Sequence, residues 1–234
     1  VRPDGRLVED WRPMTRASVR CTAEGLGPDG QSVRESNGYN VAGRAGLEFL
    51  DEDRQQRLVD EAVHRTLFLL DATSPQPGEM PVVLAAGPSA ILLHEAIGHG
   101  MEADFNRKRI SIYADKMNQS IADAQVTIVD DGTLDGARGS INIDDEGNEG
   151  QRTVLVQDGV LRTYMHDRIS AAHYGVEPTG NGRRESFRSP PLPRMRNTYM
   201  LPGPHAPEAI IKSVKRGIYA ETFTNGQVMI GAGD

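Results

Sequence analysis

Apolar positions along residues 51–70 recur every three or four residues, as on one face of an α-helix. Charged residues crowd the first turns of this segment, and Leu58, Ala62 and Leu67 belong to its apolar face. Earlier in the chain, residues 16–22 alternate between polar and apolar side chains, which predicts a β-strand. Residues 73–78, Thr-Ser-Pro-Gln-Pro-Gly, break both periodicities and predict a linker after the helix.

Beyond the linker, short strands and helices follow one another without an internal repeat. Residues 81–86 form a brief apolar run, which predicts a buried strand, and Ser89 is a suitable N-cap for the helix after it. Asp158 and Gly159 predict the turn of a hairpin over 153–163. The remaining predictions are strands over 124–129 and 227–231 and helices over 169–175 and 207–217. Together these elements predict an α+β fold with mixed sheets and a few helices, divided into residues 1–78 and 79–234.

The composition is that of a soluble globular protein. Hydrophobic residues make up 38% of the 234 residues, enough to bury a sizeable core, and the net charge is −7. No apolar stretch approaches the roughly 20 residues that cross a bilayer, and no basic face is evident, so neither membrane insertion nor nucleic-acid binding is expected. Cys21 is the single cysteine, which excludes an intrachain disulfide and favours the cytoplasm; we interpret it as a small packed residue.

Residues 94–99 carry the chemistry and read His-Glu-Ala-Ile-Gly-His. Two histidines and a glutamate are what a hydrolytic zinc site requires, because neutral imidazoles hold the ion at about 2.0–2.1 Å and the ion activates water. A glutamate beside the ligands can take the water proton and pass it to a leaving amine. This pattern predicts His94 and His99 as zinc ligands and Glu95 as general base. The alternative is a helix end whose histidines only satisfy carbonyls and solvent.

The spacing of the two histidines constrains the backbone. Positions five apart on a regular α-helix are separated by roughly 140° around its axis, so both imidazoles could not reach one ion. The helix must therefore widen as a π-type turn, or end between the histidines. Gly98 and Gly100 flank His99 and would make such a distortion low in energy. The sequence thus predicts a metal motif on a distorted helix end.

A longer run, residues 94–108, closely resembles the signature of the TldD branch of the TldD/PmbA family. The resemblance covers most of residues 80–234 and is weaker before residue 80, chiefly over 5–13. Its further blocks are 129–133, 143–147, 178–186, 193–195 and 197–200. It implies a cytoplasmic zinc metallopeptidase that acts on small or unfolded peptides. It also implies assembly with a PmbA-type partner subunit that lacks the metal motif, or self-assembly as a homo-oligomer.

The same resemblance implies that His94 and His99 bind the metal and that Glu95 is the base. The family's third ligand is a cysteine far downstream in a C-terminal region, and Cys21 does not occupy the matching place. We therefore expect this chain to be truncated at both ends, without that region and without most of the family's N-terminal domain. Two histidines alone leave two coordination positions open.

Several other polar residues admit two interpretations. Glu102 and Asp104 either hydrogen-bond a ligand imidazole or are solvated charges at a helix end. The acidic cluster at 144–146 with Glu149 is either a calcium loop or a solvated turn, and it lacks the EF-hand alternation. The loop at 180–184 either holds a peptide carboxylate through its two arginines, Arg183 and Arg184, or is a packed surface loop.

The remaining histidines are expected to be ordinary polar residues. His64 is expected on the surface of the helix at 51–70, and His173 and His205 stand alone in the sequence. His166 lies in a hairpin arm, and it is either an ordinary polar residue or one that reaches a functional site.

The sequence therefore favours a zinc-dependent metallopeptidase. The rival from another class is a non-catalytic peptide-binding or assembly subunit, which the intact His94 and His99 disfavour. A third alternative is a partial reading frame without independent activity.

Overall fold

The computed structural model describes residues 4–87 and 90–223, and the chain in it divides into two compact units. The hairpin unit comprises Trp11–Glu79 and Gly136–Arg138. The motif unit comprises Val1–Asp10, Met80–Asp135 and Gly139–Asp234. The division predicted from the sequence, 1–78 and 79–234, remains a prediction.

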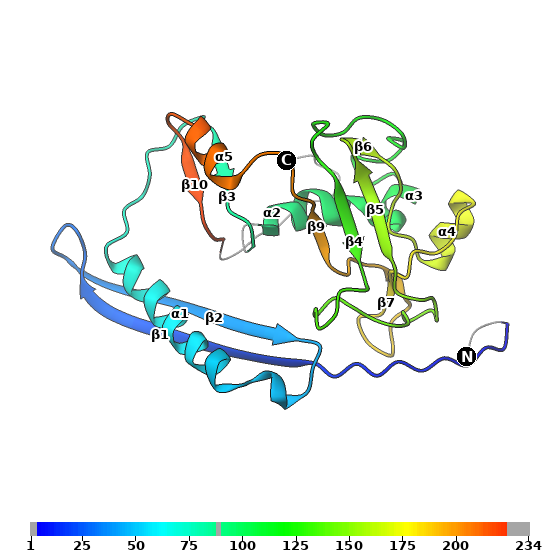
Figure 1. Cartoon of the computed structure of the whole chain (residues 1–234), viewed down its shortest axis with the longest axis horizontal. Helices are drawn as coiled ribbons and strands as arrows, with labels where there is room; N and C mark the ends of the chain where they lie inside the picture. The colour runs from blue at the N-terminus through cyan, green and yellow to red at the C-terminus, as the bar shows by residue number, and fades with distance from the viewer. Residues whose placement is uncertain (1–3, 88–89, 224–234) are drawn as a thin grey trace. The chain divides into compact units, whose positions relative to one another are not determined.

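The hairpin unit consists of a long antiparallel ribbon and a helix packed on it (Figure 1). Strands β1 (Thr15–Leu26) and β2 (Ser32–Gly43) pair along their whole length, and a short 3-10 turn, η1 (Leu47–Phe49), precedes helix α1 (Glu52–Leu70). The Asp51 side chain caps α1 by accepting a 2.9 Å hydrogen bond from Arg54 N. The predicted helix and the predicted strand at 16–22 are therefore confirmed, although the strand is longer than expected.

A four-stranded antiparallel sheet forms the centre of the motif unit (Figure 1). Its strands, in spatial order, are β6 (Val160–Leu161), β5 (Arg152–Gln157), β4 (Ile128–Asp131) and β9 (Thr198–Met200). Asp158 and Gly159 join β5 to β6 with φ of 51° and 77°, which confirms the predicted hairpin turn.

The predicted strand at 124–129 forms only from residue 128 onward. Its first half is instead a turn, because the Asp123 side chain accepts from Gln125 N and the Asp123 carbonyl accepts from Val126 N, both at 2.9 Å. Those two amides are therefore not available for pairing with a neighbouring strand.

Short helices pack against this sheet and carry the metal motif. In chain order they are α2 (Ile91–Leu93), the π-helical turn η3 (His94–Gly98), the 3-10 turn η4 (His99–Met101), α3 (Ala103–Arg107) and α4 (Arg168–Tyr174). Met101 and Ala103 are buried in one core cluster with Leu155, Leu161 and Met165. The end of the motif is thereby anchored in the hydrophobic core. Helix α4 ends at Gly175, whose φ is 67°, close to the predicted bounds 169–175.

A small parallel pair of strands, β3 (Val82–Leu84) with β10 (Ile218–Ala220), is less buried than predicted. The strand at 81–86 was expected to be buried, but Val82 and Leu84 are 51% and 44% exposed, so this expectation is wrong. The reason is that β3 has a single strand partner within the described part of the chain.

Helix α5 (Pro207–Ser213) ends before the predicted residue 217. Val214 has an extended backbone, and Ile218 N then donates to Pro81 O at 3.0 Å, so pairing with the chain before β3 draws these residues out of the helix. A last antiparallel pair joins β7 (Gly182–Arg183) to β8 (Leu192–Pro193). The predicted Ser89 cap and the strand at 227–231 lie outside the described residues. Within the described ranges, no helix combines the length and apolarity needed to traverse a bilayer.

Candidate metal centre

The backbone of the motif deviates from an α-helix at the place the histidine spacing requires. Residues His94–Gly98 form one π-helical turn, and His99 N donates to the carbonyl of His94, five residues earlier. Of the two distortions that the sequence left open, a widened turn or a helix end between the histidines, the structure has the widened turn.

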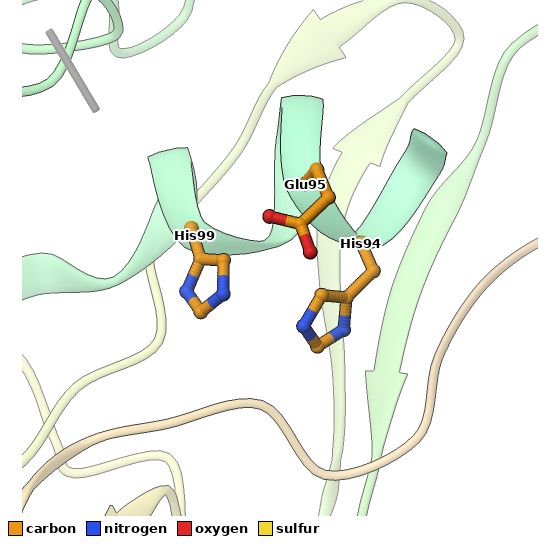
Figure 2. A group of neighbouring side chains, drawn as sticks. All are labelled: His94, Glu95 and His99. Atoms are coloured by element: carbon orange, nitrogen blue, oxygen red, sulfur yellow. The ribbon is translucent and has the colours of Figure 1, made fainter. Parts of the chain in front are cut away.

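This turn brings three potential metal ligands together. Each of His94, Glu95 and His99 offers one ligand atom, and these atoms lie within 4.8 Å of one another. The two imidazole rings have centroids 4.8 Å apart and meet edge to face at 82°. In Figure 2 both rings extend to the same side of the turn, with the Glu95 carboxylate between them. In the described ranges this is the one group of three or more such residues.

The glycines of the motif act differently from the prediction. Gly98 has φ −54° and ψ −58°, which any residue adopts in a helix, so its conformational freedom is not what permits the turn. Glycine is needed there for space: a Cβ on Gly98 would collide with Sδ of Met195, and one on Gly100 would lie 2.6 Å from Cε2 of Tyr113. The two glycines let the turn approach its neighbours closely.

Side chains from α3 and beyond hold the turn in place. The Gly100 carbonyl accepts from Asn106 Nδ2 at 2.8 Å and from Ser111 Oγ at 2.7 Å. Asn106 Nδ2 also donates to the Glu102 carbonyl at 3.0 Å. These bonds satisfy carbonyls at the end of a helix, which would otherwise be buried without a donor.

Glu102 links the motif to a cation from another segment. Its Oε2 lies 3.3 Å from His99 Nδ1 and 3.1 Å from Arg194 Nη1, while the side chain is fully buried. Of the two interpretations that the sequence left open for Glu102, the structure has the contact with an imidazole, that of His99, and not the solvated charge. Asp104 has no such role, because its Oδ2 lies 3.6 Å from Lys108 Nζ and no contact with either histidine is found among the described residues.

The two histidines have different electrostatic surroundings. The hydrogen bond to Glu102 raises the pKa of His99, against a smaller opposing effect of burial. Burial lowers the pKa of His94, and the nearby His99 lowers it further. Burial raises the pKa of Glu102, and the contacts with His99 and Arg194 oppose that shift. A lowered pKa keeps His94 neutral near pH 7, the form that binds metals.

The other candidates lie outside this group. The Asp144 carboxylate accepts from the backbone amides of Glu146 and Asn148 in its own turn, at 2.9 and 2.7 Å, and from that of Gly182 on β7 at 3.1 Å. Asp144 is buried, so it is not the solvated charge that one of the two interpretations expected. Arg183 and Arg184 are exposed, and the positive charge of Arg183 contributes to the lowered pKa of His94. Their loop therefore lies within electrostatic range of the motif.

Neither Cys21 nor any of the other histidines joins the cluster. Cys21 is half-buried on β1 of the hairpin unit. The prediction that His64 is a surface residue is confirmed, and His173 and His205 are exposed as well. His166 is buried against the rings of Tyr164 and Tyr174, with centroid distances of 6.1 and 5.4 Å.

Sequence reasoning gave Arg194 no role. It lies 92 positions from Glu102, and no periodicity or spacing connects the two residues. The one signal available was the block at 193–195 in the family resemblance.

Comparisons with known proteins identify the family to which the chain is similar. Residues 77–234 match the family model described as the PmbA/TldA metallopeptidase C-terminal domain. A metalloprotease TldD homolog of Haemophilus influenzae is 46% identical over 98% of this chain and 48% of its own length. A zinc metalloprotease TldD homolog of Saccharolobus solfataricus is 38% identical over 69% of this chain and 38% of its own length.

The fold has solved counterparts as well. The crystal structure of TldE from Thermococcus kodakarensis superposes with a TM-score of 0.69 at 21% identity, over 90% of this chain and 46% of that chain. The present chain spans about half the length of the curated relatives that match most of it. The family model, the identities and the fold together show that this chain belongs to the TldD/PmbA family of metallopeptidases.

Proposed function

We propose that the protein is a zinc-dependent metallopeptidase that hydrolyses peptide bonds of small or unfolded peptides. The observation that carries the proposal is the π-helical turn, which gathers ligand atoms of His94, Glu95 and His99 within 4.8 Å. The Saccharolobus relative is named a zinc metalloprotease, which supports the choice of metal.

The donor set fits zinc. Two imidazoles with a carboxylate nearby are ligands that Zn²⁺ takes, and tetrahedral ligands at about 2.0–2.1 Å from the ion stand roughly 3.4 Å apart. The ligand atoms of His94, Glu95 and His99 lie within 4.8 Å of one another, which allows a wider spacing than this. Because His94 is exposed, a small rotation of its side chain can bring its ligand atom closer to that of His99. We propose His94 and His99 as the ligands, and a third protein ligand, which the family resemblance gives as a cysteine, from outside this group. The ion would supply Lewis acidity toward a peptide carbonyl oxygen.

Glu95 is the proposed general base. Its carboxylate lies between the two imidazoles in Figure 2, and a carboxylate in that place can take a proton from the attacking water. It would then pass the proton to the nitrogen of the departing amine, so that the amine leaves neutral. His94 and His99 would hold the ion beside Glu95 and do not exchange protons in this scheme.

The substrate and partner follow from the family. We propose that the protein acts in the cytoplasm and assembles with a PmbA-type subunit or with itself; the likeness of its fold to that of TldE supports a partner of the same fold. An unfolded protein should be cleaved where its folded form resists, because only the unfolded chain exposes its peptide bonds to the site. Cleavage of both forms at equal rates would contradict this substrate class.

Glu95→Gln tests the mechanism in the protein as its gene encodes it. The substitution should abolish peptide cleavage and leave zinc uptake intact, because the amide cannot accept the proton but occupies the same volume. Glu177→Gln, at an exposed glutamate outside the group, is the matched control and should retain activity. Wild-type activity in a pure Glu95→Gln preparation would refute the role of Glu95.

Elemental analysis separates the enzyme from a non-catalytic peptide-binding or assembly subunit. The enzyme should retain about one zinc per chain. Substitution of His94 or His99 by alanine should remove it. A protein without zinc that still binds peptides would favour the binding subunit.

A further inference from the structure

A buried carboxylate connects His99 to Arg194. Both His99 Nδ1 and Arg194 Nη1 contact the same oxygen of Glu102, at 3.3 and 3.1 Å. An ionised carboxylate only accepts hydrogen bonds, so the proton in the contact with His99 belongs to Nδ1. The lone pair is then on Nε2, the nitrogen that remains for a metal.

The position of Arg194 is itself determined by the central sheet. Arg194 N donates to the Asn181 carbonyl at 2.9 Å, and Asn181 Nδ2 donates back to the Arg194 carbonyl at 3.0 Å. Asn181 Nδ2 also donates to Asp130 Oδ2 on β4 at 2.7 Å. A continuous series of hydrogen bonds therefore runs from β4 to the imidazole of His99.

The charge of Arg194 is what a buried Glu102 requires. Glu102 has no exposed surface, and a buried carboxylate without a cation is strongly unfavourable. Arg194 Nη1 is also held by the Pro193 carbonyl at 2.7 Å, so the guanidinium is fixed from two sides. The carboxylate oxygen facing His99 is therefore fixed as well.

We propose that Glu102 and Arg194 are a positioning pair for His99. They hold its imidazole in the Nδ1–H tautomer and in the orientation that directs Nε2 to the candidate metal centre. This proposal rests on the proposed function, in which His99 is a zinc ligand. Removal of a carboxylate partner from a metal-binding histidine typically weakens metal affinity about 10–100-fold.

The first experiment needs no metal. Nitrogen-15 NMR of the histidine side chains, in the zinc-free protein at a pH where the imidazole is neutral, reports which ring nitrogen carries the proton. Wild-type His99 should be protonated on Nδ1, and Glu102→Ala should shift the proton toward Nε2. Asp104→Asn removes another buried carboxylate nearby, one that pairs with Lys108, and should leave the tautomer unchanged. An Nε2–H tautomer in the wild type overturns the proposal, and this result does not depend on a variant that folds.

The second experiment measures zinc affinity by competition with a chelating dye. Glu102→Ala and Arg194→Met should each bind zinc about 10–100-fold more weakly, and the double variant no more weakly than Glu102→Ala alone. Glu102→Gln retains an acceptor oxygen and should recover part of the loss, and Asp104→Asn should match the wild type.

The two experiments separate failures of the two proposals. A wild type that binds zinc, with Glu102→Ala binding it equally well, overturns the positioning pair and leaves the proposed function in place. A wild type with the Nδ1–H tautomer that does not bind zinc overturns the proposed metal chemistry, while the hydrogen-bonding role of Glu102 stands.

Discussion

Gly98 lies so close to Met195 that a β-carbon at position 98 would collide with the methionine sulfur. Met195 is almost fully buried and belongs to the core cluster of the motif unit. The π-helical turn thus packs against the core at Gly98, which lies between Glu95 and His99 in the motif. Close packing, rather than an unusual backbone conformation, explains the glycine.

Replacement of Gly98 tests this packing. Gly98→Ala should lower the free energy of unfolding by about 1–3 kcal/mol, because the added methyl group overpacks a buried contact. It should also weaken zinc binding, since the shifted turn separates His94 from His99. Urea denaturation and zinc titration measure the two effects. Gly203→Ala, with no neighbour within 4 Å of its added Cβ, is the control and should change stability by less than about 0.5 kcal/mol. Equal stabilities of the two variants would contradict the packing explanation.

Zinc should stabilise the folded protein through the candidate centre. A ligand that binds only the folded state adds about 2.7 kcal/mol at a hundredfold excess over its Kd, so the thermal midpoint should rise with zinc and fall again with a chelator. His94→Ala and His99→Ala should lose this response. His173→Ala, at an exposed histidine outside the group, should keep it. A zinc-dependent rise of the same size in His94→Ala would place the metal elsewhere.

His166 should make stability depend on pH. Burial lowers the pKa of His166 to about 4, against 6.5 for an ordinary histidine. Between pH 4 and 6.5 the unfolded chain binds a proton that the folded chain does not. The contribution of the neutral, buried His166 to the free energy of unfolding is therefore fully present above pH 6.5 and is lost as the pH falls toward 4. The loss amounts to about 3 kcal/mol, at about 1.4 kcal/mol per unit.

The pH dependence is checked by denaturation of the wild type and His166→Gln across that range. The variant should be less stable at pH 7 and should show a flatter dependence on pH, because the buried group no longer titrates. His64→Gln, at the exposed histidine on α1, should follow the wild type. Parallel curves for the wild type and His166→Gln would show that His166 contributes nothing to the slope.

Two glycines with positive φ should differ in their tolerance of alanine. At Gly175, φ is 67° and an added Cβ meets nothing within 4 Å, so Gly175→Ala should cost about 1–2 kcal/mol for the left-handed backbone alone. At Gly159, φ is 77° and the Cβ would also collide with the carbonyl oxygen of Ala122 and lie 2.7 Å from that of Asp123. Gly159→Ala should therefore cost about 2–5 kcal/mol in total. Chemical denaturation of both variants measures the difference, and equal losses would show that the backbone carbonyls of Ala122 and Asp123 can move aside at no cost in stability.

Local patterns predicted the elements whose stability comes from near neighbours in the chain. Helix α1 was predicted from its apolar spacing and its acidic first turn, and the β5–β6 hairpin from Asp158 and Gly159. A helix that either widens or ends between His94 and His99 was predicted from their five-residue separation, because that spacing is incompatible with a regular helix aimed at one ion; the π-helical turn is the first of these two alternatives.

By itself the sequence determined which chemical groups stand together in the motif, since His94, Glu95 and His99 lie within one widened turn. Only the tertiary structure decided that Glu102 meets Arg194 and that Gly98 meets Met195. The physical reason is that each of these contacts joins segments distant in the chain, and its geometry depends on how the central sheet packs against the motif. Hydrophobic periodicity, caps and turn residues report only on neighbours within a few positions.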